Sequence, residues 1–297
     1  MATLKDILNK INAVKKTKQI TKAMNMVAAS RLRGAQTSME AFRPYAGKFA
    51  EVLGSLSERA GEEANPLLVP REDAKKAHIL LCTSDRGLCG GFNINLIEKA
   101  EGFMQEKAGQ DLEFSFTNFG KKGRDWCRKN NLTIDSEHLG VVGASFGFHV
   151  AMTAGKKLVD EFLRGQYDEV YIVYAEFLSM AKQLPVLKQI LPIPPLEPDE
   201  EADKVETGAY LPEHICEPSP EELLGEMLPR NVYVQIYSAL LETSTSEHAA
   251  RMMAMDNATN ACNDMLENLT LVYNKARQAA ITAELMDIVG GAEALRG

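Results

Sequence analysis

The chain has 297 residues, of which 45% are hydrophobic and 25% charged, and its formal net charge at pH 7 is −8. This length and apolar content suffice for a sizeable core and for more than one structural unit. No apolar run is long enough to span a membrane, and we expect neither a transmembrane segment nor a signal peptide. The five Cys form no CxxC pair and show no metal-binding spacing with the five His, which predicts free thiols and no zinc site.

Residues 1–57 predict one long helix, because apolar positions recur at alternating spacings of three and four. Thirteen of the sixteen positions in this frame are apolar. They are Leu4, Ile7, Ile11, Val14, Lys18, Thr21, Asn25, Ala28, Leu32, Ala35, Met39, Phe42, Ala46, Phe49, Leu53 and Leu56. Such a stripe is typical of a coiled-coil seam. The three polar positions are consecutive, and we expect that section to face outward to another protein. We also expect a kink or a restart of the helix at Pro44.

The same segment is strongly basic. Residues 1–50 contain ten Lys or Arg against two acidic residues. We call four of these cations, Lys18, Lys22, Arg31 and Arg33, the basic band. Such a helix fits nucleic acid, anionic lipid or an acidic protein surface. The lack of an aromatic residue before Phe42 disfavours base stacking and membrane anchoring. A solvated face and an acidic protein partner therefore remain as the two interpretations.

Residues 75–195 predict an α/β domain, because the hydrophobic period changes from helical to strand-like after a loop over residues 57–77. Expected strands are His78–Thr83, Leu112–Asn118, Leu132–Ile134, Glu169–Ala175 and Val186–Ile193, and expected helices are Ile94–Lys107, 120–130 and Phe146–Leu163. Strands that alternate with helices indicate a Rossmann-like parallel sheet with helices on its faces. The short connection between the last two strands predicts that these two pair antiparallel.

Residues 196–218 are rich in Pro and Glu and predict an exposed loop, and residues 219–297 predict a second long helix. Ser219 is expected to cap this helix and Gly290-Gly291 to break it. A second apolar stripe comprises Met255, Ala258, Cys262, Met265, Leu269, Val272, Ala276, Ala279, Ala283 and Met286. Two such stripes predict an antiparallel coiled coil of the terminal helices. One compact helical bundle is the alternative.

The sequence offers no convincing active site, so we expect no catalytic residue, no metal and no cofactor. The glycines of SDRGLCGG (84–91) fit neither GxGxxG nor the P-loop, and we interpret them as a tight turn. Cys89 has no His nearby in sequence to act as its base. His248 and Arg251 are interpreted as a solvent-exposed helix face.

Four sequence blocks in order resemble the gamma subunit family of F-type ATP synthases. They are ITKAMNMVAAS (20–30), SDRGLCGGFN (84–93), LVYNKARQ (271–278) and ITAELMDIVGGAEAL (281–295). The resemblance covers essentially the whole chain. It implies a non-catalytic rotor shaft, whose antiparallel coiled coil lies inside an alpha3beta3 hexamer and whose α/β domain contacts the epsilon subunit and the membrane c-ring.

The resemblance also assigns roles to single residues. It implies that Met24 faces an acidic lever loop of the beta subunit. It further implies that Arg251, Gln278, Thr282 and Glu284 take part in shaft–hexamer contacts or in coupling. Cys216 has no second Cys in the Pro/Glu-rich loop, which argues against the redox-regulated chloroplast variant. We therefore expect a bacterial subunit, peripheral on the cytoplasmic face of the plasma membrane.

Two other classes of protein remain as alternatives. The first is a nucleotide-binding α/β enzyme with helical dimerisation arms, in which a nucleotide would protect the glycine-rich loop. The second is a coiled-coil shaft of the archaeal or vacuolar motors. The strand-rich residues 78–193 count against this second class, which should lack an α/β domain.

Overall fold

The computed structural model describes residues 3–60, 65–71, 74–107, 109, 112–194 and 219–294. The chain divides into two compact units. The first unit combines Met1–Ala29 with Arg251–Gly297, and the second comprises Ser30–Ala250. Two helices, α1 (Leu4–Ala60) and α5 (Pro220–Ala294), contribute to both units. The expected loop over residues 196–218, with Cys216, lies outside the described residues.

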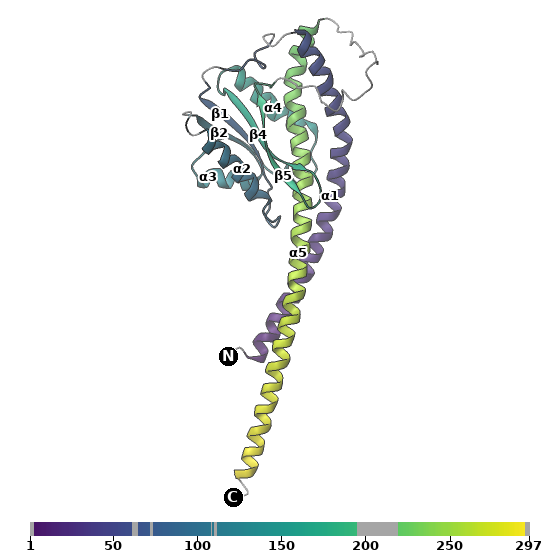
Figure 1. Ribbon diagram of the computed structural model, residues 1–297, viewed down its shortest axis with the longest axis vertical. Helices are drawn as coiled ribbons and strands as arrows, with labels where there is room; N and C mark the ends of the chain where they lie inside the picture. Colours follow the sequence, from purple (N-terminus) through teal and green to yellow (C-terminus); the bar gives the residue numbers. More distant parts are fainter. Residues whose placement is uncertain are drawn as a thin grey trace. The chain divides into compact units, whose positions relative to one another are not determined.

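The second unit contains one five-stranded sheet (Figure 1). Its strands are β1 (Lys76–Cys82), β2 (Glu113–Phe119), β3 (Thr133–His138), β4 (Glu169–Phe177) and β5 (Gln183–Leu191). They lie in the order β3-β2-β1-β4-β5. The first four strands are parallel and β5 is antiparallel to β4, as the sequence predicted. The six residues of β1 after Lys76 are all buried, as expected for a central strand of a parallel sheet.

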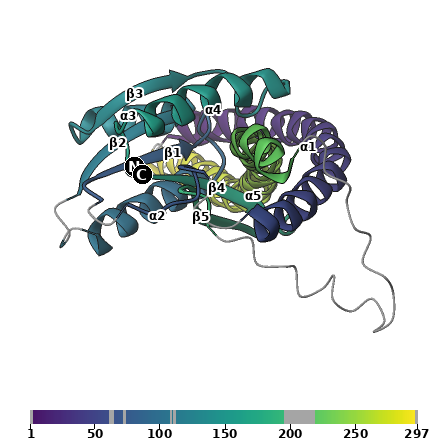
Figure 2. The same ribbon diagram turned by 90° about the horizontal axis from the view of Figure 1, so that it is seen from above.

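Helices cover both faces of this sheet. On one face, α2 (Phe92–Glu106) and α3 (Lys121–Lys129) pack against residues such as Ile79 and Phe116. On the other face, α4 (Phe148–Leu163) packs against Leu80 and Ile172, together with the second unit's segments of α1 and α5. Figure 2 shows these α1 and α5 segments side by side. Because β1 connects to β2 on one side and β4 returns to the other side of β1, the sheet is doubly wound.

One expected helix boundary is confirmed and one is wrong. The backbone N–H of Glu222 donates to Ser219 Oγ at 3.2 Å, so Ser219 caps α5 as predicted. Helix α1 runs through Pro44 without a restart, and the kink expected there stays a prediction. Helix α5 likewise continues through Gly290 and Gly291 to Ala294. Glycine costs only about 1 kcal/mol in a helix, and the Ala-Glu-Ala that follows favours helix.

The seam predicted for α1 is the one that the structure buries. All sixteen positions are buried or half-buried, including the three polar ones. The expectation that the polar section faces outward is therefore wrong. Thr21 Oγ1 lies 2.8 Å from Thr259 Oγ1, and Asn25 Nδ2 donates to Met252 O at 2.9 Å. The polar side chains stay in the seam because α5 supplies hydrogen-bond partners, and these pairs show that the two helices run antiparallel.

The seam predicted for α5 is half correct. Met255 is buried, and Cys262 and Leu269 are half-buried. Met265 and Val272, however, are 53% and 50% exposed. The neighbouring Leu266, Tyr273 and Ala280 are half-buried in place of Met265, Val272 and Ala279. Every second contact therefore shifts by one residue. From Ile281 to Ala292 every residue of α5 is exposed.

Candidate functional site: exposed helix surfaces and a filled crevice

The place where doubly wound folds bind ligands is filled by α5. In such folds the ligand binds at the carboxyl ends of the strands, where the strand order reverses. Here that point lies between β1 and β4, whose ladder ends at the pair Leu81 and Val173. Two residues further, the backbone N–H of Ala175 donates to Thr243 Oγ1 at 3.3 Å, and Ser246 Oγ donates to Ala175 O at 3.2 Å. Side chains of α5 thus occupy the next position along the β4 backbone.

Helix α5 is enclosed on all sides at this crevice. Six consecutive polar residues, 243–248, are buried, with exposed fractions of 0–4%. The interpretation of His248 as part of a solvent-exposed face is therefore wrong, and Arg251 is half-buried. The loop after β3 also reaches α5. A Cβ on Gly143, which has φ +81°, would lie next to Glu247 Oε2. Sequence reasoning missed this site because a run of Thr, Ser, Glu and His resembles a solvated helix face.

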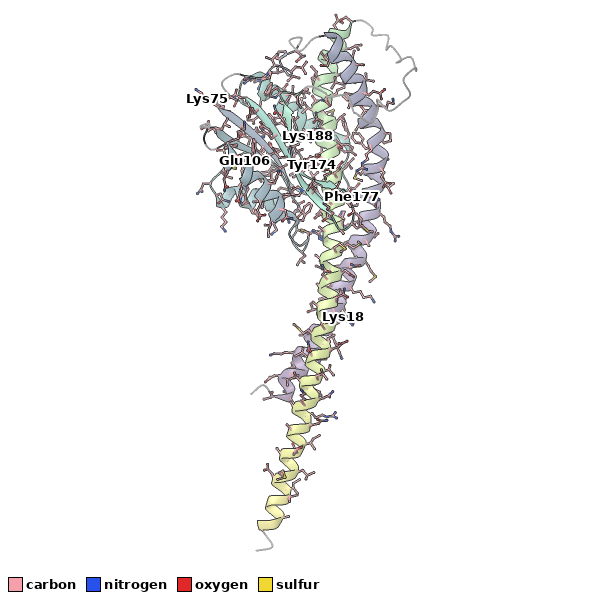
Figure 3. The ribbon with its side chains drawn as sticks, viewed as in Figure 1. Lys18, Lys75, Glu106, Tyr174, Phe177 and Lys188 are labelled. Carbon is pink, nitrogen blue, oxygen red and sulfur yellow. The ribbon has the colours of Figure 1, made fainter. Side chains whose placement is uncertain are left out.

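Charged residues surround the crevice. Glu242 Oε1 lies 4.0 Å from Arg43 Nη2, which joins α5 to α1. Burial raises the pKa of Glu242, and the Arg43 guanidinium opposes that shift. Burial also lowers the pKa of Lys188 on β5, against the attraction of Glu242. Figure 3 labels Lys188 together with Tyr174, a residue next to Ala175 on the adjoining β4.

The glycine-rich segment after β1 forms a turn and not a phosphate cradle. Leu88 and Gly90 adopt positive φ angles of 65° and 59°. Asp85 of this segment bonds backbone donors of α3 and of the loop after β3. Its Oδ1 accepts the N–H of Lys121 at the start of α3 at 3.1 Å, and its Oδ2 accepts the N–H of Gly140 at 2.9 Å. This carboxylate therefore sits where an anion would bind the N-terminus of α3.

The basic band lies partly in the seam and partly on the surface. Lys18 is half-buried, and Figure 3 labels it on α1, whereas Lys22 and Arg33 are exposed. Arg31 is also exposed, but its Nη1 donates to Gly143 O at 3.1 Å and so ties α1 to the loop after β3. The structure therefore does not present the four cations as one surface.

An apolar stripe on α1 accompanies the exposed cations. Ile20, Met26 and Val27 are 59%, 59% and 56% exposed, and Met24 is half-buried. Isolated exposed apolar residues are common, but a stripe of them on a helix indicates a binding surface. The sequence signalled this stripe, since Ile20, Met24 and Val27 lie outside the seam frame.

The end of α5 exposes a second apolar surface. Five large apolar residues between residues 281 and 289 are at least 50% exposed: Ile281, Leu285, Met286, Ile288 and Val289. The predicted contact residues Gln278, Thr282 and Glu284 are exposed on the same stretch, and Thr282 Oγ1 donates to Gln278 O at 2.9 Å. A helix that is apolar on several sides requires a surrounding partner.

The described part of the chain contains no group of three His, Cys, Asp or Glu residues placed to hold a metal ion. Within the same residues, no helix combines the length and apolar character that crossing a bilayer requires. Cys82, Cys89, Cys127 and Cys262 are not joined in disulfides. The functional surfaces that the geometry offers are thus the exposed apolar and basic faces of the first unit's helices.

The chain is similar to known proteins over its whole length. A family model described as ATP synthase matches residues 3–295. The ATP synthase gamma chain of Desulfosudis oleivorans is 66% identical, and the alignment covers 100% of both chains. The corresponding gamma chain of Desulforapulum autotrophicum is 64% identical, with 99% of this chain and 100% of the relative covered.

Solved structures show the same fold. A chain from the mitochondrial ATP synthase of Euglena gracilis, described with OSCP, F1 and c-ring in rotational state 3, aligns with a TM-score of 0.66 at 20% identity. That alignment covers 98% of this chain and 94% of the other. A chain described with the rotor of the same enzyme aligns with a TM-score of 0.60 at 18% identity, covering 94% of this chain and 98% of the other.

Proposed function

Because this chain belongs to the ATP synthase gamma-chain family, we propose that it is the central rotor shaft of a proton-translocating F-type ATP synthase. It couples rotation of the membrane c-ring to conformational change at catalytic sites on the beta subunits. Its partners are the alpha3beta3 hexamer, the epsilon subunit and the c-ring. The observation that carries the proposal is the full-length match to a gamma chain at 66% identity.

The helix pair of the first unit has the asymmetry that a rotor requires. Residues 1–29 contain six Lys against one Asp, whereas residues 251–297 contain six acidic residues against four Arg or Lys. One side of the pair is therefore basic and the other is slightly acidic. A surrounding ring of subunits would meet a different charge at each angular position of the shaft, which is the property needed to give three equivalent sites different affinities.

Of the contact residues that we propose, Lys22, Arg31, Arg33, Gln278, Thr282 and Glu284 are exposed, whereas Lys18, Met24 and Arg251 are half-buried. We assign contacts with the hexamer to the basic band (Lys18, Lys22, Arg31 and Arg33), to Met24, and to Arg251, Gln278, Thr282 and Glu284. Exposed ion pairs stabilise by up to about 1 kcal/mol each, so Lys22 and Arg33 bias the angle of the shaft without locking it. The apolar end of α5 supplies the larger, non-directional part of the contact.

The division of the chain follows the same proposal. Residues 1–57 and 219–297 form the coiled-coil shaft, and residues 75–195 form the α/β domain. The complex is peripheral to the membrane, and we assign this chain to the cytoplasmic face of a bacterial plasma membrane. An ATP-binding enzyme is disfavoured because α5 fills the crevice at the carboxyl ends of the strands.

Charge reversal tests the proposal. Lys22→Glu with Arg33→Glu should preserve assembly but lower the number of protons pumped per ATP hydrolysed in membrane vesicles. The matched control is Lys75→Glu with Lys76→Glu, which makes the same charge change on exposed residues at the start of the sheet. An unchanged ratio in the first pair, with normal subunit recovery after detergent extraction, would show that these cations are only a solvated face. A native complex without alpha, beta and c subunits would refute the function itself.

A further inference from the structure

The contact between α5 and β4 is directional, unlike the apolar packing around it. Ala175 has both of its backbone groups bonded to α5, the N–H to Thr243 Oγ1 and the C=O to Ser246 Oγ. Thr243 and Ser246 are three residues apart and therefore project from the same face of the helix. We call Thr243, Ser246 and the backbone of Ala175 the hydroxyl clamp. Figure 3 labels Tyr174 and Phe177, which lie on either side of Ala175 on β4.

A second contact holds the same turn of α5. Glu247 is 2% exposed and lies so close to Gly143 that a Cβ there would be 2.4 Å from its Oε2. The carbonyl of Gly143 in turn accepts a hydrogen bond from Arg31 Nη1 on α1. The loop after β3 therefore contacts α1 and α5, one residue along α5 from the hydroxyl clamp.

The apolar part of the contact between α5 and the domain sets the register less sharply than these polar contacts, which include a bond between the Glu242 carboxylate and the backbone of Phe177. Leu224, Leu228, Val232, Ile236 and Leu240 of α5 belong to one apolar core with α4 and the sheet. Apolar burial is proportional to area and has no direction, whereas a hydrogen bond is lost when its donor and acceptor turn away. In helical assemblies, single buried polar residues fix the register for this reason.

We propose that Thr243 and Ser246 are positioning residues that fix the rotational and axial setting of α5 on the sheet. Torque entering through the α/β domain then turns α5 without slip. This inference rests on the proposed function as a rotor shaft. It assigns a mechanical role to the crevice that other doubly wound folds use for a ligand.

The test is the assembled complex carrying Thr243→Val with Ser246→Ala, which keeps the shape of the side chains and removes both hydrogen bonds. ATP hydrolysis should be retained, while protons pumped per ATP fall at least about twofold when a proton-motive force opposes rotation. Without that opposing force the ratio should stay close to wild type.

Thr245→Val is the matched control, because Thr245 is equally buried but its hydroxyl donates to Leu241 O within α5. It should leave the ratio unchanged under load. Thr243→Ser keeps the hydroxyl and should retain coupling. Amide hydrogen exchange gives an independent readout, since Ala175 N–H should exchange faster in Thr243→Val than in Thr245→Val.

Three outcomes overturn the inference. They are equal coupling of the double variant and the Thr245→Val control under load, loss of coupling at every load, and unchanged exchange at Ala175. If the double variant does not assemble, Ser246→Ala alone must show a smaller load-dependent loss, and its absence refutes the role. If the wild-type complex itself pumps no protons, the proposed function fails, which is distinguishable from failure of the clamp.

Discussion

Gly155 of α4 marks the closest approach between α4 and α5, and an added methyl group there should destabilise the fold. A Cβ at this position would lie 2.3 Å from Tyr233 Cδ1, 2.9 Å from Tyr233 Cε1 and 3.4 Å from Ile236 Cδ1. Carbon atoms pack at about 3.5–4.0 Å, so the tyrosine ring would have to move by more than about 1 Å. Gly155→Ala therefore tests whether α4 rests directly on α5.

The expected size of the effect follows from two opposing terms. Replacing glycine by alanine inside a helix gains about 1 kcal/mol. Overpacking a filled core costs about 1–3 kcal/mol, and a contact this short belongs at the upper end. The net loss of stability should be about 2 kcal/mol. Gly102→Ala in α2 is the matched control. No atom lies within 4 Å of the added Cβ there, so only the gain of about 1 kcal/mol applies.

Urea unfolding of the full chain, followed by tryptophan fluorescence, measures both variants. Trp126 is the only tryptophan, and its ring packs edge-on to Phe116 at 5.7 Å, so it reports unfolding of the α/β domain. The midpoint should fall for Gly155→Ala and rise for Gly102→Ala. Adding Tyr233→Leu should recover much of the loss. A Gly155→Ala chain that gains as much stability as Gly102→Ala would show that α4 and α5 are not in contact at this point.

Three further predictions concern the other buried polar groups and the glycine-rich loop. Burial lowers the pKa of His78 to about 4, below its ordinary 6.5. Between these two pH values the imidazole binds a proton in the unfolded chain but not in the folded one. The free energy of unfolding should therefore fall by up to about 3 kcal/mol as the pH drops from 6.5 to 4. In His78→Gln this acid dependence should shrink, as measured by the urea midpoint at each pH. Thr21→Val should lower the free energy of unfolding by about 1 kcal/mol. A double-mutant cycle with Thr259→Val, followed by circular dichroism, should give a coupling energy of about 0.5–1.5 kcal/mol, and additive effects of the two substitutions would show that the hydroxyls are not bonded. Calorimetry should detect no ATP binding by the isolated chain, and micromolar binding abolished by Gly90→Val would contradict the account of the loop.

The sequence predicted those parts of the fold that depend on hydrophobic period. The thirteen apolar positions of the α1 seam could be predicted, because apolar side chains at a period of 3.5 form one stripe that a partner helix covers. The strands of the sheet could be predicted because β1 and β4 are apolar runs bounded by turns and charged residues. The four family blocks then identified the class of protein without any knowledge of contacts.

What could not be predicted depends on partners far away in the sequence. Residues 243–248 have the composition of a solvated helix face. Their burial depends on the backbone groups of Ala175, which bond to α5, and on the glycine at residue 143, which leaves room for Glu247. Likewise, Thr21 and Asn25 looked like an outward-facing break because their partners lie on α5. The choice between Met265 and Leu266 in the seam depends on the surface of α1, which no local pattern in α5 specifies.

The hydroxyl clamp also sets an order of events during synthesis. Ala175 precedes Thr243 by 68 residues and Ser246 by 71. At about 5–20 residues per second, the ribosome needs roughly 3 to 14 s to make that stretch. During this time the end of β4 has only water to bond the two backbone groups of Ala175. The nascent α/β domain can therefore form both hydrogen bonds of the hydroxyl clamp only after residue 246 has left the ribosome. A helix that is made after the sheet thus completes the hydrogen bonding of β4.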